Sequence, residues 1–218
     1  MSRAGFSYAQ ARMQARRTTA PTDHDWQLVR HSRDFGHCLD VFARTSLAPA
    51  TSRISRDAGP HRIETILREE WTAAVFEVAT WLPRRWQAPV HWIAPLPYLR
   101  SLAADPEDKN PLALLWAEHG KRDDDPATGW RETFAARLKS AKTARQIETA
   151  LPEFFSRYLG SNETDVGSLT DTLTGRLRKT PQTPEAMFAH LGLIALDFER
   201  ARGALSVAAL FSPPVEAA

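Results

Sequence analysis

Histidine and cysteine are the residue types in this sequence best suited to hold a metal ion or to act as nucleophiles. His24, His31 and His37 lie close together, and Cys38 follows directly. Two histidines that chelate one ion from a helix are spaced by about four residues, as in H-E-x-x-H. Because these histidines follow one another at steps of seven and six, the spacing predicts side chains on or near the helix surface and no metal site.

Cys38 is the one cysteine of the chain, and it stands beside Leu39 in a helical pattern. Its neighbour His37 is a poor base for it, since adjacent residues on a helix do not face each other. We therefore expect a buried structural thiol. A single cysteine permits no intrachain disulfide, which favours a reducing compartment.

The loops that carry nucleophilic or nucleotide chemistry have recognisable motifs, and none of them occurs in this sequence. There is no G-x-S-x-G, no G-x-x-x-x-G-K-[ST] and no G-x-G-x-x-G. The acidic run Asp123–Asp125 lacks the alternating ligands and the glycine of a calcium loop, so a solvated loop is expected. We predict no catalytic residue, no cofactor and no metal, and hence a protein that is not an enzyme.

Composition is that of an ordinary folded protein. The 218 residues are 43% hydrophobic and 25% charged, with 28 Lys and Arg against 26 Asp and Glu. Such mixed charge argues against a nucleic-acid surface. The N-terminus lacks the apolar stretch of a signal peptide, and no apolar run approaches the roughly 20 residues of a membrane span. We expect a cytoplasmic protein that meets a membrane only through partners.

Apolar residues recur at steps of three and four, without alternating runs, and this pattern predicts an all-α fold of about eight helices. We expect one domain over residues 1–218, with a loose tail at 212–218. Residues 46–60 are interpreted as a linker, and short helices and turns are expected over 84–111. The predicted helices cover 6–18, 22–44, 61–82, 112–120, 129–142, 143–160, a frayed segment within 161–180, and 184–211.

The helix at 61–82 is predicted to be central to the core, and Glu64 is expected to pair with Arg68 across one turn. In the last helix Thr183 is a favourable N-cap, followed by Pro184. Arg202 falls where the apolar step pattern of that helix expects an apolar residue. It either extends its charged end to solvent or pairs with an acid on a neighbouring helix; in a functional interpretation it makes a contact to another subunit. The apolar stripe of the helix at 61–82 consists of Ile63, Leu67, Trp71, Ala74, Val78 and Leu82.

Six of the seven tryptophans lie between residues 71 and 130. Such aromatic density is found in ligand pockets, but large side chains also fill a core where prolines interrupt the helices. The core interpretation is favoured over a site. These residues are Trp71, Trp81, Trp86, Trp92, Trp116 and Trp130.

The opening stretch YAQARMQARR places Ala4, Tyr8, Ala11 and Ala15 on one helical face. Small residues there predict close packing against the C-terminal helix. Arg12 and Arg16 lie on another face, where they are expected to meet acidic groups of a partner.

This stretch resembles the N-terminal helix of the V-type ATPase C/d family of subunits, which opens with a tyrosine followed by small residues and arginines. The C-terminal FAHLGLIALDFERARGALSVAALF is similar to the last helix of that family. The resemblance implies an all-helical, non-catalytic protein that sits on the membrane rotor ring and receives the central shaft. Family members are longer and carry three related helical units, whereas this chain has room for about two.

Two functions are predicted. The first is a structural subunit of a V-type rotary ATPase that couples the central shaft to the rotor ring during ion or proton transport. Arg12, Arg16 and Arg202 are its candidate partner-binding residues. The alternative is a stand-alone helical binding or adaptor module with a site formed by the tryptophans.

Overall fold

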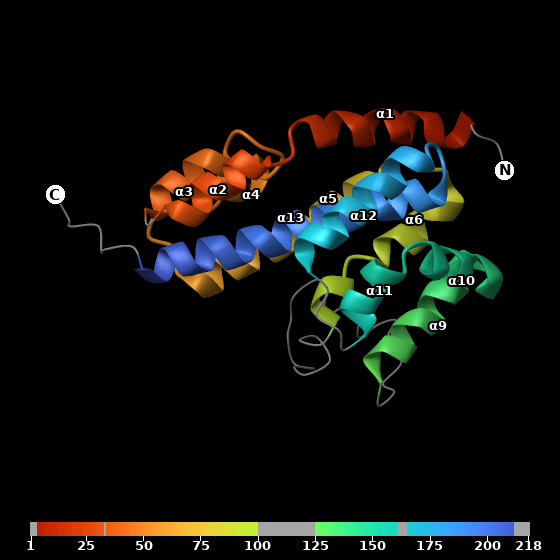
Figure 1. Ribbon diagram of the computed structural model, residues 1–218. Coiled ribbons are helices and arrows are strands. Elements are labelled where there is room, and N and C mark those ends of the chain that lie inside the picture. Colours follow the sequence, from red (N-terminus) through yellow and green to blue (C-terminus); the bar gives the residue numbers. More distant parts are fainter. Residues whose placement is uncertain (1–3, 33, 100–124, 161–164, 212–218) are drawn as a thin grey trace. The chain divides into compact units, whose positions relative to one another are not determined.

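The computed structural model describes residues 4–32, 34–99, 125–160 and 165–211. Within these ranges the protein is all-helical, as predicted, with eleven α-helices, one 3-10 helix and no strand (Figure 1). The predicted helix at 112–120, Trp116 and the tail at 212–218 lie outside the described residues. The elements are α1 (Ala4–Thr18), α2 (Asp23–His31), α3 (Phe35–Phe42), α4 (Ala48–Thr51), α5 (Pro60–Thr80), α6 (Arg84–His91), η1 (Leu96–Tyr98), α9 (Pro126–Leu138), α10 (Ala141–Ala150), α11 (Pro152–Leu159), α12 (Val166–Lys179) and α13 (Pro184–Phe211).

The chain divides into two compact units. The first unit contains Met1–Gln10 and Ala74–Leu193, and the second contains Ala11–Ala73 and Ile194–Ala218. Helices α1, α5 and α13 therefore each contribute residues to both units.

The predicted count of about eight helices is wrong, partly because one expected helix is two. Residues 22–44 form α2 and α3 instead of a single helix. The carboxylate of Asp34 accepts hydrogen bonds from the backbone N–H groups of Gly36, at 2.8 Å, and His37, at 3.3 Å. This N-cap begins a new helix, α3. A short polar side chain that accepts hydrogen bonds from the backbone competes with the bonds that would continue the preceding helix.

Two further predicted segments differ for similar local reasons. The expected linker at 46–60 contains α4, and its residues Leu47 and Ile54 are buried, so it is part of the core. The expected helix at 143–160 is interrupted before Pro152, which begins α11. Proline lacks the N–H that continues a helix and disfavours helical geometry in the residue before it.

The predicted stripe of the helix at 61–82 is confirmed, because all six of its residues are buried. The Glu64–Arg68 pair on α5 is also confirmed, with Oε1 and Nη2 3.1 Å apart. At the start of α13, the hydroxyl of Thr183 accepts a hydrogen bond from the N–H of Ala186 at 3.3 Å, as expected for an N-cap.

In the first unit, Trp92 and Trp130 exchange hydrogen bonds. The indole N–H of Trp92 donates to the carbonyl of Trp130 at 3.0 Å, and that of Trp130 donates to the carbonyl of Trp92 at 2.9 Å. Phe134 stacks on Trp130, and Arg137 lies over the ring of Trp92. This reciprocal pair joins the end of α6 to α9, which in turn packs against α10. The five described tryptophans of the cluster are buried, which confirms the core interpretation for them.

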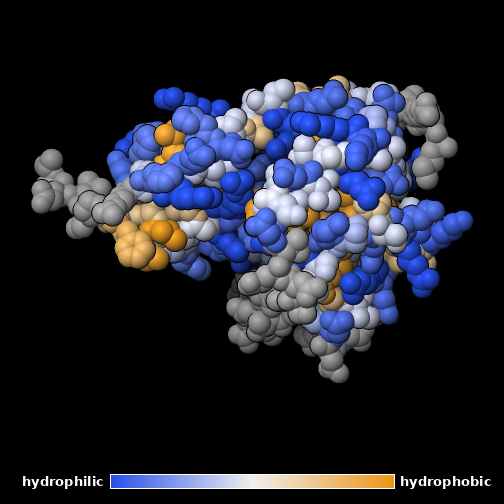
Figure 2. All heavy atoms as spheres, viewed as in Figure 1, coloured by the Kyte–Doolittle hydropathy of each residue, from blue (hydrophilic) through white to orange (hydrophobic). Residues whose placement is uncertain are grey.

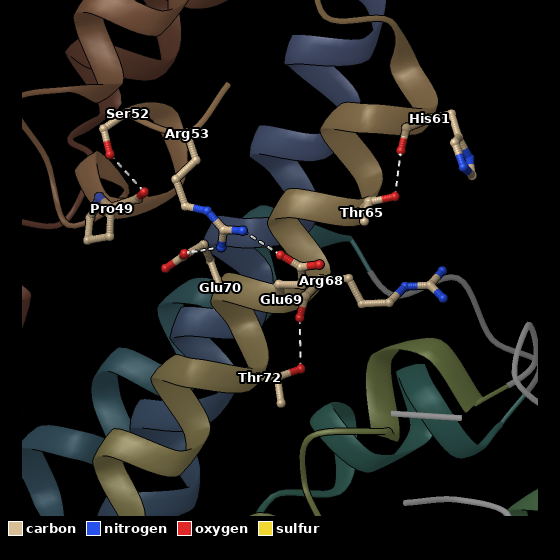
Figure 3. A network of polar contacts seen from close by, with 9 residues as sticks. All are labelled: Pro49, Ser52, Arg53, His61, Thr65, Arg68, Glu69, Glu70 and Thr72. Atoms are coloured by element: carbon tan, nitrogen blue, oxygen red, sulfur yellow. Dashed lines mark hydrogen bonds and ion pairs between the residues drawn. The ribbon is translucent and has the colours of Figure 1, made fainter. Parts of the chain in front are cut away.

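In the second unit, a polar network ties the segment after α4 to α5 (Figure 3). Arg53 donates to Glu70 at 2.6 Å and to Glu69 at 2.5 Å. Helices α2, α3 and α4 belong to the same unit, where α3 contacts both of the others. Exposed ion pairs of this kind are individually weak, so the network serves mainly to orient the segment after α4 against the side of α5.

The predicted packing face of α1 is wrong. Ala11 and Ala15 are exposed, and Tyr8 is 61% exposed. The buried side of the helix consists instead of Phe6, Ala9, Gln10 and Met13. Phe6 and Met13 offer more apolar area than alanines, and burial of that area decides which side of the helix turns inward.

Leu67→Ala is expected to lower the free energy of unfolding by about 2–5 kcal/mol, because it removes a fully buried side chain and leaves a cavity. Ala15→Leu, at an exposed position, should change it by less than about 0.5 kcal/mol. Urea denaturation of both variants checks this pair. A large cost for Ala15→Leu would restore the alanine face as a packing face.

His91 in α6 provides a pH-dependent contribution to stability. Its ring stacks on Phe76 of α5 with centroids 4.2 Å apart, and burial, with the charge of Arg137, lowers the pKa of His91 below its ordinary value of 6.5. The folded protein therefore takes up this proton less readily than the unfolded chain does. The free energy of unfolding is therefore fully retained above a pH of 6.5. It decreases as the pH falls below that value, because the unfolded chain binds the proton more readily.

His91→Gln should therefore lose less stability than the unsubstituted protein between about pH 8 and about pH 5. The measurement is the urea midpoint at both pH values. His37→Gln, at an exposed histidine, is the matched control. Equal acid sensitivity of His91→Gln and the unsubstituted protein would contradict the assignment.

Candidate functional site

The three predicted partner-binding arginines lie in the second unit. Arg12 is exposed and Arg16 is partly buried on α1. The Nε of Arg202 is 3.6 Å from Oε2 of Glu64 on α5. Arg202 thus pairs with an acid on a neighbouring helix, which was one of its three interpretations. Burial raises the pKa of Asp197, and the charge of Arg16 opposes this rise. Arg16 and Arg202 therefore interact with different carboxylates.

The strongest electrostatic feature of this unit is the buried carboxylate of Asp197 on α13. An Arg17 guanidinium N–H donates to it at 2.8 Å, and Arg16 and Arg200 add their charges. Loss of solvation nevertheless raises the pKa of Asp197, and the arginines limit that rise. Sequence reasoning missed Asp197. Its signal is a single acid within the apolar run LGLIALDF.

Arg200, one helical turn beyond Asp197, connects this charge to α2. Its guanidinium lies 4.0 Å from the ring centroid of Trp26, a favourable cation–π contact. Trp26 in turn packs its ring edge-to-face with Phe42 of α3, with centroids 5.1 Å apart. The Arg200 side chain is therefore held in one orientation by an aromatic surface.

A groove of about 340 Å³ runs between α2 and α13 at this contact. Its apolar lining includes Trp26 and Val29 of α2 and small side chains of α13, and Arg30 and Arg200 supply the positive charge. Burial, together with the charge of Arg30, lowers the pKa of Arg200, against the opposing effect of Asp197 and Asp23. The lining residues are Trp26, Val29, Arg30, Ser32, Arg200, Gly203, Ala204, Val207 and Ala208.

The histidines are exposed, as predicted, but the structure brings them around one shallow hollow of about 490 Å³, beside Gln27. Within the described ranges no group of three or more His, Cys, Asp or Glu side chains is placed to hold a metal ion. Cys38 is buried, as predicted, and burial raises the pKa of its thiol. A thiol with a raised pKa is a poor nucleophile.

The α2–α13 groove is suited to binding rather than to bond making. It offers two positive charges, of which Arg200 is held against Trp26, beside apolar surface, with no histidine or cysteine among its lining residues. A scan against protein-family models and searches of curated proteins and solved structures found no match to this chain. None of the helices in the described residues is long and apolar enough to cross a membrane.

Asp197→Ala is expected to lower the free energy of unfolding by about 3–5 kcal/mol, because it leaves Arg17 without its carboxylate in a partly buried place. Asp197→Asn keeps the size of the side chain and should cost less. The double variant Asp197→Leu with Arg17→Met removes both charges and should recover most of the loss. Denaturant unfolding of the three variants is the measurement. A cost below about 1 kcal/mol for Asp197→Ala would mean that the pair is only a surface contact.

Proposed function

We propose that this chain is a non-catalytic structural subunit of a V-type rotary ATPase that couples the central shaft to the membrane rotor ring. The observation that carries the proposal is the ion pair between Arg17 and Asp197, at 2.8 Å. Arg17 belongs to the opening stretch and Asp197 to the C-terminal stretch, and these are the two parts of the chain with the family resemblance. The family-like segments are thus partners in one unit.

The helical build of the described residues supports the same proposal, because a coupling protein needs packed helices and no reaction site. In this function the protein lies on the cytoplasmic side and reaches the membrane only through its partners. Arg12 and Arg16 of α1 contact acidic groups of the shaft or ring, and Arg202 of α13, whose side chain is 41% exposed beside its internal partner Glu64, lies open to the same groups. Because Ala11 and Ala15 are also exposed, the contact surface extends to the alanine face of α1.

A stand-alone binding or adaptor module is the second candidate. The tryptophans at 71–130 no longer support it, since those described are core residues. The α2–α13 groove favours it instead, because a groove that combines positive charge with apolar walls is suited to binding a partner.

The proposal is tested by purifying the tagged chain from native membranes at low salt and identifying what accompanies it by mass spectrometry. Proteins of the shaft and of the rotor ring are expected. Arg12→Ala with Arg16→Ala should weaken this association, and added salt should weaken it in the unsubstituted protein, because exposed charges are screened.

The matched control is Arg84→Ala with Arg85→Ala, which removes two exposed charges from α6. Melting temperatures of both double variants separate assembly from folding. Purification without shaft or ring proteins would overturn the proposal, and equal association of both double variants would remove the arginines from the contact.

A further inference from the structure

The groove between α2 and α13 continues into an exposed apolar strip. Val207, Leu210 and Phe211 of α13 are 56%, 66% and 76% exposed. Val207, Leu210 and Phe211 follow one another at helical steps of three and one, so they share one side of α13. Figure 2 shows this gathering of hydrophobic side chains at the C-terminal end of α13. Contiguous apolar surface of this kind marks interaction sites in folded proteins.

The wall formed by α13 is shaped for close approach. Gly203, Ala204 and Ala208 carry small side chains or none, and a Cβ added at Gly203 would meet nothing within 4 Å. The space beside Gly203 is therefore open. From Arg200 to Phe211 the helix rises about 17 Å, or about three turns. A rod-shaped occupant of similar length fits this surface better than a small molecule does.

The charge of the groove indicates the chemistry of that occupant. Arg30 and Arg200 lie close enough for their charges to repel, and within the described residues neither forms an ion pair. Asp197 and Asp23 attract Arg200 through their charges, and both effects are larger than the repulsion from Arg30. Because both arginines line the groove, a carboxylate from outside would complement their positive charge, and the contact with Trp26 already holds Arg200 in position.

We propose that the groove between α2 and α13 binds an amphipathic α-helix of a partner protein, with its apolar face on Trp26, Ala204 and Val207 and an acidic residue against Arg30 and Arg200. This is the helix-in-groove mode of recognition. Nucleic acid is disfavoured by the presence of only two cations beside a mostly apolar lining, and a flat membrane surface is disfavoured by the concave shape. The inference does not rest on the ATPase assignment.

The test uses two synthetic amphipathic helical peptides with the same leucine stripe, one with glutamates and one with lysines on the flanking positions. Fluorescence anisotropy of the labelled peptides measures their binding to the full chain. The glutamate peptide should bind at least about tenfold more tightly than the lysine peptide, and added salt should reduce the difference.

Val207→Glu places a carboxylate in the groove and should weaken the glutamate peptide at least about tenfold. Arg200→Gln should weaken it too, with little effect on the lysine peptide. Tyr8→Glu is the matched control, since it adds the same charge at another exposed large side chain, and it should leave the affinity unchanged. Circular dichroism of each variant verifies that it is folded.

Three outcomes overturn the inference: no binding of the glutamate peptide, equal binding of both peptides, or equal loss with Val207→Glu and Tyr8→Glu. Binding of vesicles of anionic lipid that Val207→Glu abolishes, without peptide binding, would assign the surface to a membrane instead. If the peptide does not bind, the co-purification test of the ATPase proposal is unaffected. If no rotor protein co-purifies, the peptide-binding result still holds.

Discussion

Burial of the central part of α13 is the constraint on which the rest of the structure depends. From Ala186 to Phe198 every residue is buried, so this stretch has no side that faces water. A helix that is apolar all round is stable only when other elements cover it on every side. In the first unit, Phe188 contacts Trp86 and Phe134, and in the second unit Phe198 packs against Trp71. Many short helices are needed to bury this part of α13 on all sides.

The tryptophans show how such a core tolerates polar atoms. A buried indole N–H without an acceptor costs free energy. Trp92 and Trp130 solve this by donating to each other's backbone carbonyl groups, and Trp92 lies between α6, which contains Pro89, and η1, which follows Pro95. The tryptophans that suggest a ligand pocket in the sequence therefore fill the core and satisfy its polar atoms.

Asp197 is the one carboxylate in the buried stretch of α13, and it links stability to the proposed binding surface. Its burial is unfavourable unless cations compensate it, and Arg17 of α1 supplies the closest one. Arg200, one turn later, shares that charge and is held by Trp26 at the groove. The internal salt bridge and the partly buried Arg200 thus belong to one connected set of charges in the second unit.

The sequence by itself determined the features that depend on local spacing. The all-helical class, the buried stripe of α5, the Glu64–Arg68 pair and the Thr183 cap follow from residues three or four apart. The buried state of Cys38 followed from its apolar neighbour in the same way. Such signals need no knowledge of what lies across the fold.

Only the tertiary structure decided which face of α1 is buried and where a binding surface forms. A face of alanines can pack closely or lie in solvent. The face of α1 that carries Phe6 and Met13 is buried instead, because its burial removes more apolar area from water. The Arg17–Asp197 and Trp26–Arg200 contacts join residues that are distant in the chain. Their geometry is set by the packing of whole helices, for which local spacing carries no information.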